Sequence, residues 1–204
     1  TAAAEVQRKN AEKDADKKPD RDLGKEMMVK VIRRELPLKI HAHRADDILT
    51  AIRICREFNV RYTLEHCTEG YLIPDFIKAA LKESCEGIII GPLFTDRSKI
   101  ELKNLSYKAP KTLWENGIAF AMMTDSPVIP EQYLPVCAAI AVREGLPEEE
   151  ALRSITINAA KITGIDDRVG SIEIGKDADV AVFSAHPFDF RARCKLTVIN
   201  GRIA

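Results

Sequence analysis

Residues 38–48 read LKIHAHRADDI, a stretch in which a short apolar strand runs directly into the beginning of a helix. Asp46 or Asp47 is placed to cap that helix, because a short acidic side chain can accept the first free backbone N–H groups. One face of the helix is then apolar and is formed by Ile48, Ile52 and Phe58. This stretch therefore predicts one strand–helix unit.

The same alternation continues along the chain. RYTLEH (61–66) is typical of a strand and precedes a helical segment over about 74–83, while GIIIGP (87–92) is typical of a buried strand followed by a long loop. IAFAMMTDS (118–126) is nearly continuously apolar, as expected for a parallel strand covered on both faces, and residues 130–143 follow it as a helix. Four strands alternating with helices predict a parallel α/β fold.

The length of this region limits how much of a barrel it can form. A complete eight-unit (β/α)8 barrel needs about 31 residues per unit, so residues 37–164 have room for about four units. Residues 165–204 alternate apolar residues with Gly, Asp and Asn, which predicts a small unit of short antiparallel strands. Residues 1–36 form a charged helical leader, in which an amphipathic helix runs from Leu23 to the stop at Leu36–Pro37.

Charge and cysteine content exclude several classes of protein. The 31 basic and 31 acidic residues cancel, so no overall positive field attracts nucleic acid or an anionic membrane. No apolar run approaches the roughly 20 residues that span a bilayer, and TAAAEVQRKN lacks the apolar core of a secretory signal. Five scattered cysteines without a CxxC pair favour reduced thiols. We therefore expect a cytoplasmic protein without a nucleic-acid or membrane partner.

Polar residues that can bind a metal stand where the predicted strands end. His41 and His43 are two apart and point to one side of their strand, while His66 and Asp125 end two later strands. Imidazole and carboxylate groups hold zinc while leaving a position open for water. A single such histidine is more often structural, and an Asp before Ser-Pro is commonly a turn or cap residue, but the combination favours a hydrolytic metal site. His186 is expected to be a turn residue.

The order of these motifs resembles a known family. HAHRADDI, LEHCTEG, GPLFTDRSKIEL, AMMTDSPV and SITINAAKITGIDDRVGSIEIGKDADVAVF are similar to the metal-dependent amidohydrolases, specifically those like imidazolonepropionase, over residues 37–204. Ala159 stands where proline is common in that family. The resemblance implies a distorted (β/α)8 barrel, of the TIM-barrel type, with a small composite β-sandwich.

The resemblance also implies which barrel strands are present. The family's metal-binding aspartate lies on the eighth strand, which places Asp125 there, HAH (41–43) on the fifth strand and His66 on the sixth. HAH is then not the family's paired-histidine motif, which belongs to the first strand. We therefore expect the C-terminal half of a TIM-like barrel, strands five to eight, plus part of the β-sandwich, with the N-terminal half of the same enzyme as a partner.

Roles for individual residues follow from the resemblance. His41 would be the fifth-strand metal ligand, and His43 would support that ligand or face the substrate. Asp125 would bind the metal and accept a proton from the activated water. His66 would bind a second metal or polarise the scissile carbonyl.

The loop after the third predicted strand carries three more candidates. Arg97, Lys99 and Glu101 would orient the substrate, although a solvated charged loop explains them equally well. The cofactor would be a divalent metal, zinc in the first instance, as one ion or two. The fragment by itself is expected to bind the metal weakly or to be empty.

The resemblance implies a hydrolase that cleaves carbon–nitrogen bonds other than peptide bonds, in a small-molecule substrate such as a cyclic amide, imide or amidine. A dipeptidase-like or deaminase reaction on the same barrel is the enzymatic alternative, and a catalytically inert half-barrel is the other. Open sheet edges predict a homo-oligomer or retention of the other half, and the chain alone is expected to be inactive. The predicted interface lies along 38–40, 62–64 or 118–122.

Overall fold

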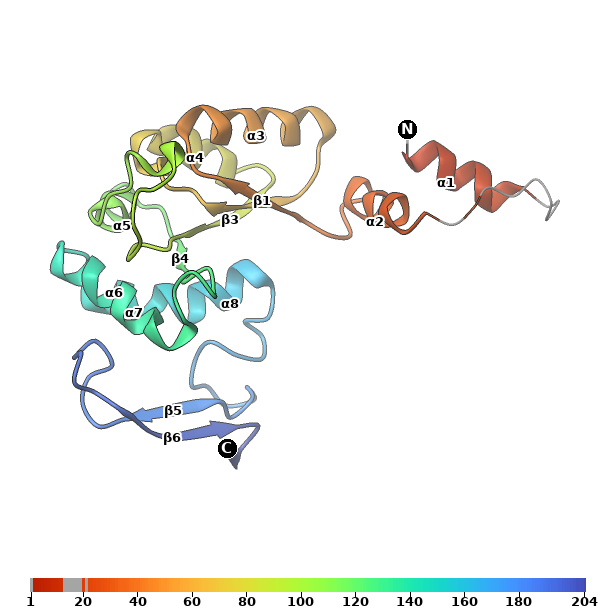
Figure 1. The fold of residues 1–204 in the computed structure, drawn as a ribbon. Helices are drawn as coiled ribbons and strands as arrows, with labels where there is room; N and C mark the ends of the chain where they lie inside the picture. Colours follow the sequence, from red (N-terminus) through yellow and green to blue (C-terminus); the bar gives the residue numbers. More distant parts are fainter. Residues whose placement is uncertain (1, 13–19, 21) are drawn as a thin grey trace.

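The computed structural model describes residues 2–12, 20 and 22–204 (Figure 1). Two helices, α1 (Ala2–Ala11) and α2 (Leu23–Ile32), pack against each other and extend to one side of the other elements. α2 begins where the sequence predicts, because the side chain of Asp22 caps it by accepting the Lys25 backbone N–H at 3.0 Å. The predicted leader is thus partly helical, and its positions 1, 13–19 and 21 lie outside the described residues.

Four parallel strands form the central sheet. They are β1 (Leu38–Ala42), β2 (Tyr62–His66), β3 (Cys85–Ile90) and β4 (Ala121–Met122), arranged in the order β1-β2-β3-β4. Every neighbouring pair is parallel. This confirms the predicted mixed α/β fold with a parallel sheet, and it brings the carboxyl ends of all four strands to one edge.

Helices cover the sheet and separate it from the C-terminal strands. α3 (Ala45–Phe58) contacts β1 and α4 (Pro74–Leu81) contacts β3. The shorter helices that follow in the chain are α5 (Ala109–Glu115), α6 (Leu134–Arg143), α7 (Glu148–Ser154) and α8 (Ile157–Thr163). In Figure 1, α6, α7 and α8 lie between the parallel sheet and β5 and β6.

The core lies around β2 and β3. Leu64 and Ile88 are completely buried, as are Ile48 on α3 and Ile77 on α4. α8 approaches β3 so closely that a Cβ atom on Gly87 would lie 2.4 Å from Ile162, so the contact requires glycine at this position. Burial of the strands on both faces explains why their sequences are nearly continuously apolar.

Some details of the helices differ from the sequence-based expectations. α3 begins two to three residues earlier than a cap at Asp46 or Asp47 implies. Its N-cap is Arg44, which makes no side-chain cap hydrogen bond, and both aspartates lie in the first turn. Phe58 is 62% exposed and does not share the buried face of α3. α2 ends at Ile32, before Pro37, because Arg34 has a left-handed backbone with φ 62°, which cannot continue an α-helix.

Three further segments differ in length or type. The predicted long loop after β3 contains α5, and the helix expected over 130–143 is a 3-10 turn at Glu131–Tyr133 followed by α6. The apolar run 118–126 pairs with β3 only at Ala121–Met122. Tertiary burial, which periodicity cannot distinguish from strand pairing, explains the apolar character of the flanking residues Ile118 and Phe120.

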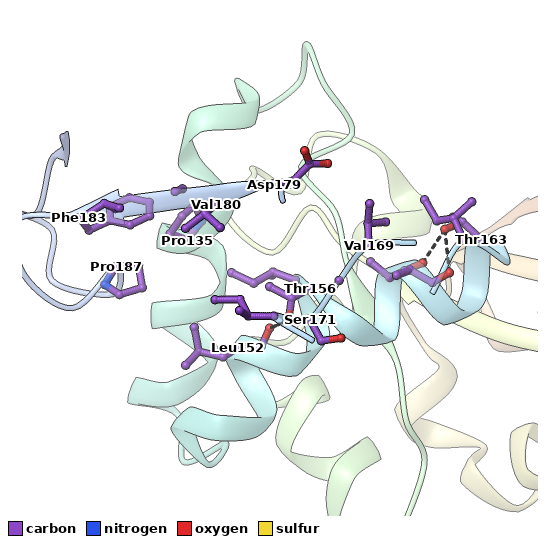
Figure 2. A pocket seen from close by; sticks show the side chains of 18 of the residues that line it. Pro135, Leu152, Thr156, Thr163, Val169, Ser171, Asp179, Val180, Phe183 and Pro187 are labelled. Carbon is purple, nitrogen blue, oxygen red and sulfur yellow. Dashed lines mark hydrogen bonds between the residues drawn. The ribbon is translucent and has the colours of Figure 1, made fainter. Parts of the chain in front are cut away.

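The C-terminal strands form a separate antiparallel sheet. β5 (Val180–Phe183), β6 (Cys194–Ile199) and β7 (Arg202–Ile203) lie in the order β5-β6-β7, as the sequence predicts for this region. Figure 2 shows the cavity of about 890 Å³ between this sheet and α6–α8, with Leu152 and Phe183 among its lining side chains. The β5–β7 sheet is therefore incompletely packed on the helices.

Several global expectations can now be compared with the structure. All five cysteines are free, and all but Cys194 are buried. Among the described residues, none of the helices is long and apolar enough to cross a membrane. Two of the three suggested interface segments, 62–64 and 118–122, consist mainly of residues buried within the chain, whereas 38–40 lies on the edge strand β1 and stays partly exposed.

Candidate metal centre

Three histidines meet at the carboxyl ends of β1 and β2. His41, His43 and His66 each offer a nitrogen atom, and these atoms all lie within 4.8 Å of one another. The ring centroids are 4.7 Å apart for His41 and His43, 4.1 Å for His41 and His66, and 4.3 Å for His43 and His66. His41 and His43 thus point to the same side of β1, as their spacing predicts. We call this group the histidine triplet.

The ring of His66 is oriented by a backbone carbonyl. His66 Nδ1 donates to the Gly91 carbonyl oxygen at 2.8 Å, and because that oxygen only accepts, the hydrogen lies on Nδ1 and leaves the Nε2 lone pair free. Gly91 has φ 132°, and a Cβ there would lie 2.3 Å from the Met123 carbonyl oxygen. Only glycine fits this close approach, which holds the acceptor for His66 in place.

The ring of His43 lies between a hydroxyl and a carboxylate. His43 Nδ1 and Thr68 Oγ1 share a hydrogen bond of 2.7 Å, and His43 Nε2 lies 3.8 Å from Glu101 Oε1. Both His43 and His66 are 5% exposed, whereas His41 is exposed. The triplet thus has two buried imidazoles and one that faces solvent.

Burial keeps the two buried imidazoles neutral. It lowers the pKa of His43 to about 4, assisted by the neighbouring His66 and His41 and opposed by Glu101. Burial also lowers the pKa of His66, while its bond to Gly91 and the charge of Asp125 act in the opposite direction. Neutral imidazole is the form that binds metal ions, so the triplet offers the right donor chemistry at neutral pH.

Asp125 lies after β4 and outside the triplet. Its side chain is exposed, and its charge partly opposes the lowering of the His66 pKa by burial. His66, Cys67 and Asp125 all have positive φ, at 67°, 44° and 52°. Left-handed backbone at residues other than glycine is strained and gathers at functional sites, which marks this edge of the sheet.

The three charged loop residues occupy different environments. Arg97 Nη2 donates to the Leu105 carbonyl oxygen at 2.6 Å, so the guanidinium is held within its own loop. Lys99 Nζ lies 3.6 Å from Glu101 Oε1, and Lys99 is exposed. Of these three residues, Glu101 is the one whose side chain lies close to the triplet, because it faces His43 Nε2.

A cavity of about 360 Å³ opens beside the triplet along β1. It is lined by Ile40, His41, His43 and Glu101 together with residues of α3. This space adjoins both His41 and Glu101, so a small molecule held there would lie next to the histidine nitrogens. Among the candidates, the structure therefore brings together His41, His43, His66 and Glu101.

Sequence reasoning missed Thr68 and Gly91, which make hydrogen bonds to the rings of His43 and His66, and it missed the buried Glu69 beside them. Thr68 and Glu69 follow His66 in the quoted motif LEHCTEG, and that position is the signal that could have found them. Gly91 acts through its backbone oxygen, which leaves no side-chain signal. His186 lies in a turn as expected, where its Nδ1 accepts the Phe188 N–H at 3.3 Å, and its Nε2 also lies 3.3 Å from Glu148 Oε1 on α7.

Comparisons with known proteins point to one family. A model of the Amidohydrolase family matches residues 4–204. The structure of an amidohydrolase from Thermotoga maritima MSB8 superposes with a TM-score of 0.90 at 42% identity, covering 100% of this chain and 52% of that chain. An imidazolonepropionase from Streptococcus pyogenes serotype M1 is 33% identical over 133 residues, which are 56% of this chain and 31% of that protein.

A second curated relative matches over most of the chain. The amidohydrolase tasK from Hapsidospora irregularis is 26% identical over 183 residues, 88% of this chain and 18% of that protein. The chain thus spans about half the length of the Thermotoga protein and less of the two curated relatives.

Proposed function

The chain belongs to the amidohydrolase family and is similar to its imidazolonepropionase-like members, and we propose a function from this premise. We propose that it forms part of a metal-dependent hydrolase that cleaves carbon–nitrogen bonds other than peptide bonds. The observation that carries the proposal is the histidine triplet, whose three ligand atoms lie within 4.8 Å at the carboxyl ends of parallel strands. That edge is where α/β barrels place their catalytic groups.

In this proposal, β1–β4 are strands five to eight of a (β/α)8 barrel. The chain superposes over its whole length on 52% of the Thermotoga amidohydrolase, which supports such a division. Residues 37–164 would then supply half of the barrel, residues 165–204 part of a β-sandwich, and residues 1–36 a leader. The edge strand β1 would pair with a strand from the other half of the enzyme or from a second copy.

His41, His66 and Asp125 are the residues that would hold a divalent cation, for which zinc suits the nitrogen-rich donor set. When bound, the cation lowers the pKa of water toward neutrality and polarises a carbonyl oxygen. The lone pair of His66 Nε2, left free by the Nδ1 bond to Gly91, would hold the cation; alternatively the ring, once protonated at Nε2 as well, would donate to the carbonyl oxygen that becomes negative. Asp125 accepts the proton from the attacking water.

The remaining site residues orient the substrate in this scheme. Glu101 accepts an N–H group of the substrate next to His43, and Arg97 and Lys99 present positive charge on the same loop. A cyclic amide has an N–H group that Glu101 can bind and a carbonyl group that the metal centre can polarise. The similarity to an imidazolonepropionase supports this substrate class. Free thiols in the core agree with a cytoplasmic location.

Metal binding by the 204-residue chain is the first test. We expect cobalt(II) to bind weakly and with one-to-one stoichiometry in a titration followed by its visible absorption, because this chain supplies only some of the ligands. His66→Ala should abolish the signal, whereas the control His186→Ala should preserve it. Equal binding by wild type and His66→Ala would contradict the proposed centre.

Hydrolysis by the complete, zinc-loaded gene product is the second test. We expect turnover of a cyclic amide such as imidazolonepropionate, a near-complete loss in Asp125→Asn, and little change in the control Asp167→Asn. Turnover of a Xaa-Pro dipeptide or of adenosine instead would select the dipeptidase or deaminase alternative. No turnover of any of these by a metal-loaded protein would favour an inert scaffold.

A further inference from the structure

We propose that Glu69 is a positioning residue, which fixes His43 and the loop carrying Glu101 relative to each other. The inference rests on the proposed metal centre for its functional meaning. Glu69 follows β2 in the turn after His66 and is 7% exposed. A carboxylate this deeply buried needs hydrogen-bond donors for its oxygen atoms, because burial removes the water that would otherwise solvate its charge.

The backbone N–H and the Oε2 atom of Glu69 bind the two residues that flank Arg44. Its backbone N–H donates to the His43 carbonyl oxygen at 2.9 Å, and its Oε2 accepts the Ala45 backbone N–H at 2.8 Å. Ala45 is the first residue of α3, whose N-cap Arg44 makes no cap hydrogen bond, so the carboxylate of Glu69 replaces the missing cap from another loop. The backbone that presents His43 is therefore fixed at two points.

The other oxygen holds the loop after β3. Glu69 Oε1 accepts from Asn104 Nδ2 at 2.8 Å, and the nearby Tyr71 hydroxyl donates to the Asn104 carbonyl oxygen at 2.9 Å. Asn104 follows Glu101 by three residues, and Glu101 faces His43 Nε2. The two oxygens of one buried carboxylate thus join the two segments that bring His43 and Glu101 together.

The hydrogen-bond polarity of the Glu69–Asn104 pair provides a sharp test. Asn104→Asp places two carboxylates against each other and should push the loop away. The double variant Glu69→Gln/Asn104→Asp restores a hydrogen bond, because the introduced glutamine donates through its amide nitrogen while its oxygen still accepts from Ala45. Glu69→Gln alone should be milder, because the Asn104 amide can rotate to present its oxygen. Asn116→Asp, at the end of α5, is the matched control.

The main measurement is cobalt(II) affinity of the 204-residue chain. We expect Asn104→Asp to lose about tenfold or more in affinity, because displacing His43 would remove a ring that packs against the ligands His41 and His66, and the double variant to return within about threefold of wild type. Thermal unfolding, recorded for each variant, separates this loss from unfolding of the chain. Wild-type affinity in a folded Asn104→Asp chain, or failure of the double variant to recover, would overturn the role of Glu69.

A metal-free measurement keeps this inference separate from the proposed function. In NMR spectra of the apoprotein, the ring resonances of His43 should shift in Asn104→Asp and return in the double variant, and Asn116→Asp should leave them unchanged. If the wild-type chain takes up no cobalt, residues 1–204 do not form the metal centre by themselves, and these shifts still decide the positioning role. His43 resonances that are identical in all variants would refute it.

Discussion

The two sheets of this protein differ in how much of their apolar surface they bury. Around β1–β4, strand residues such as Leu64 and Ile88 are completely buried, and helices pack closely against the strands. Near β5–β7, Ile172 is 88% exposed, Ile203 is 76% exposed, and a cavity of about 890 Å³ separates the sheet from α6–α8.

The two sheets are therefore stabilised by different interactions. The parallel sheet is held by burial of large side chains, which stabilises by roughly 25 cal/mol per Å² of apolar surface. The antiparallel sheet depends more on backbone pairing and surface contacts, which contribute little net free energy. The histidine triplet lies on the well-packed sheet, where its backbone is supported from several directions.

Thiol labelling should give the largest contrast between the two regions. Cys194 on β6 is exposed, whereas Cys55, Cys67, Cys85 and Cys137 are at most 4% exposed in the parallel-sheet region. We expect iodoacetamide to modify Cys194 at least about a thousandfold faster, because the buried thiols react only after an opening that costs several kcal/mol. Peptide mass spectrometry over time measures this, and comparable rates would show that the core is loose.

Side-chain truncation should lower the free energy of unfolding more in the parallel sheet than in the β5–β7 sheet. Leu64→Ala removes a completely buried side chain and should lower the free energy of unfolding by about 3–5 kcal/mol. The matched change Val182→Ala on β5, where the side chain is 44% exposed, should cost less than about 1 kcal/mol. Denaturant titration compares them, and similar losses would mean that the β5–β7 sheet is packed as firmly as the core.

Alkaline pH should destabilise the parallel-sheet region selectively. Burial raises the pKa of Cys67 from 9.0 to about 12, so above pH 9 the thiol ionises in the unfolded chain before it does so in the folded one. Stability is therefore lost as pH rises from 9 toward 12, by about 1 kcal/mol at pH 10 from this group.

Thermal unfolding at pH 8 and pH 10 measures this loss. Cys67→Ala should unfold with a smaller alkaline decrease than wild type, whereas Cys194→Ala, the control on β6, should keep the full decrease. The prediction fails if Cys67→Ala and wild type lose the same stability between the two pH values.

A surface ion pair beside the β5–β7 sheet should give the smallest effect. Arg168 Nη2 lies 2.6 Å from Asp177 Oδ2, and the arginine side chain is 66% exposed. Because solvent screens such pairs, Asp177→Asn should lower the free energy of unfolding less than any of the changes above, and the loss should shrink further in 1 M salt. A larger, salt-independent loss in denaturant titration would show that this pair supports the β5–β7 sheet.

Local sequence patterns determined the order and type of most elements. The alternation of strands and helices from Leu38 onward was predictable because strand and helix periodicities depend on neighbouring residues alone. Placing His41, His43 and His66 at strand ends followed from the same patterns, and the spacing of His41 and His43 put them on one side. Short helices such as α5 were missed, since seven residues carry too little periodic signal.

The tertiary structure alone decided how the triplet is oriented. His66 donates to the carbonyl of Gly91, 25 residues away, and Glu69 joins Ala45 to Asn104 across 24 and 35 residues. Backbone oxygens have no sequence signature, and a carboxylate has many partners within reach in a folded chain, so these contacts follow from how β1, β2 and β3 pack. The sequence by itself determined which chemical groups stand at the edge of the sheet; the packing of distant segments decided which of their atoms face one another.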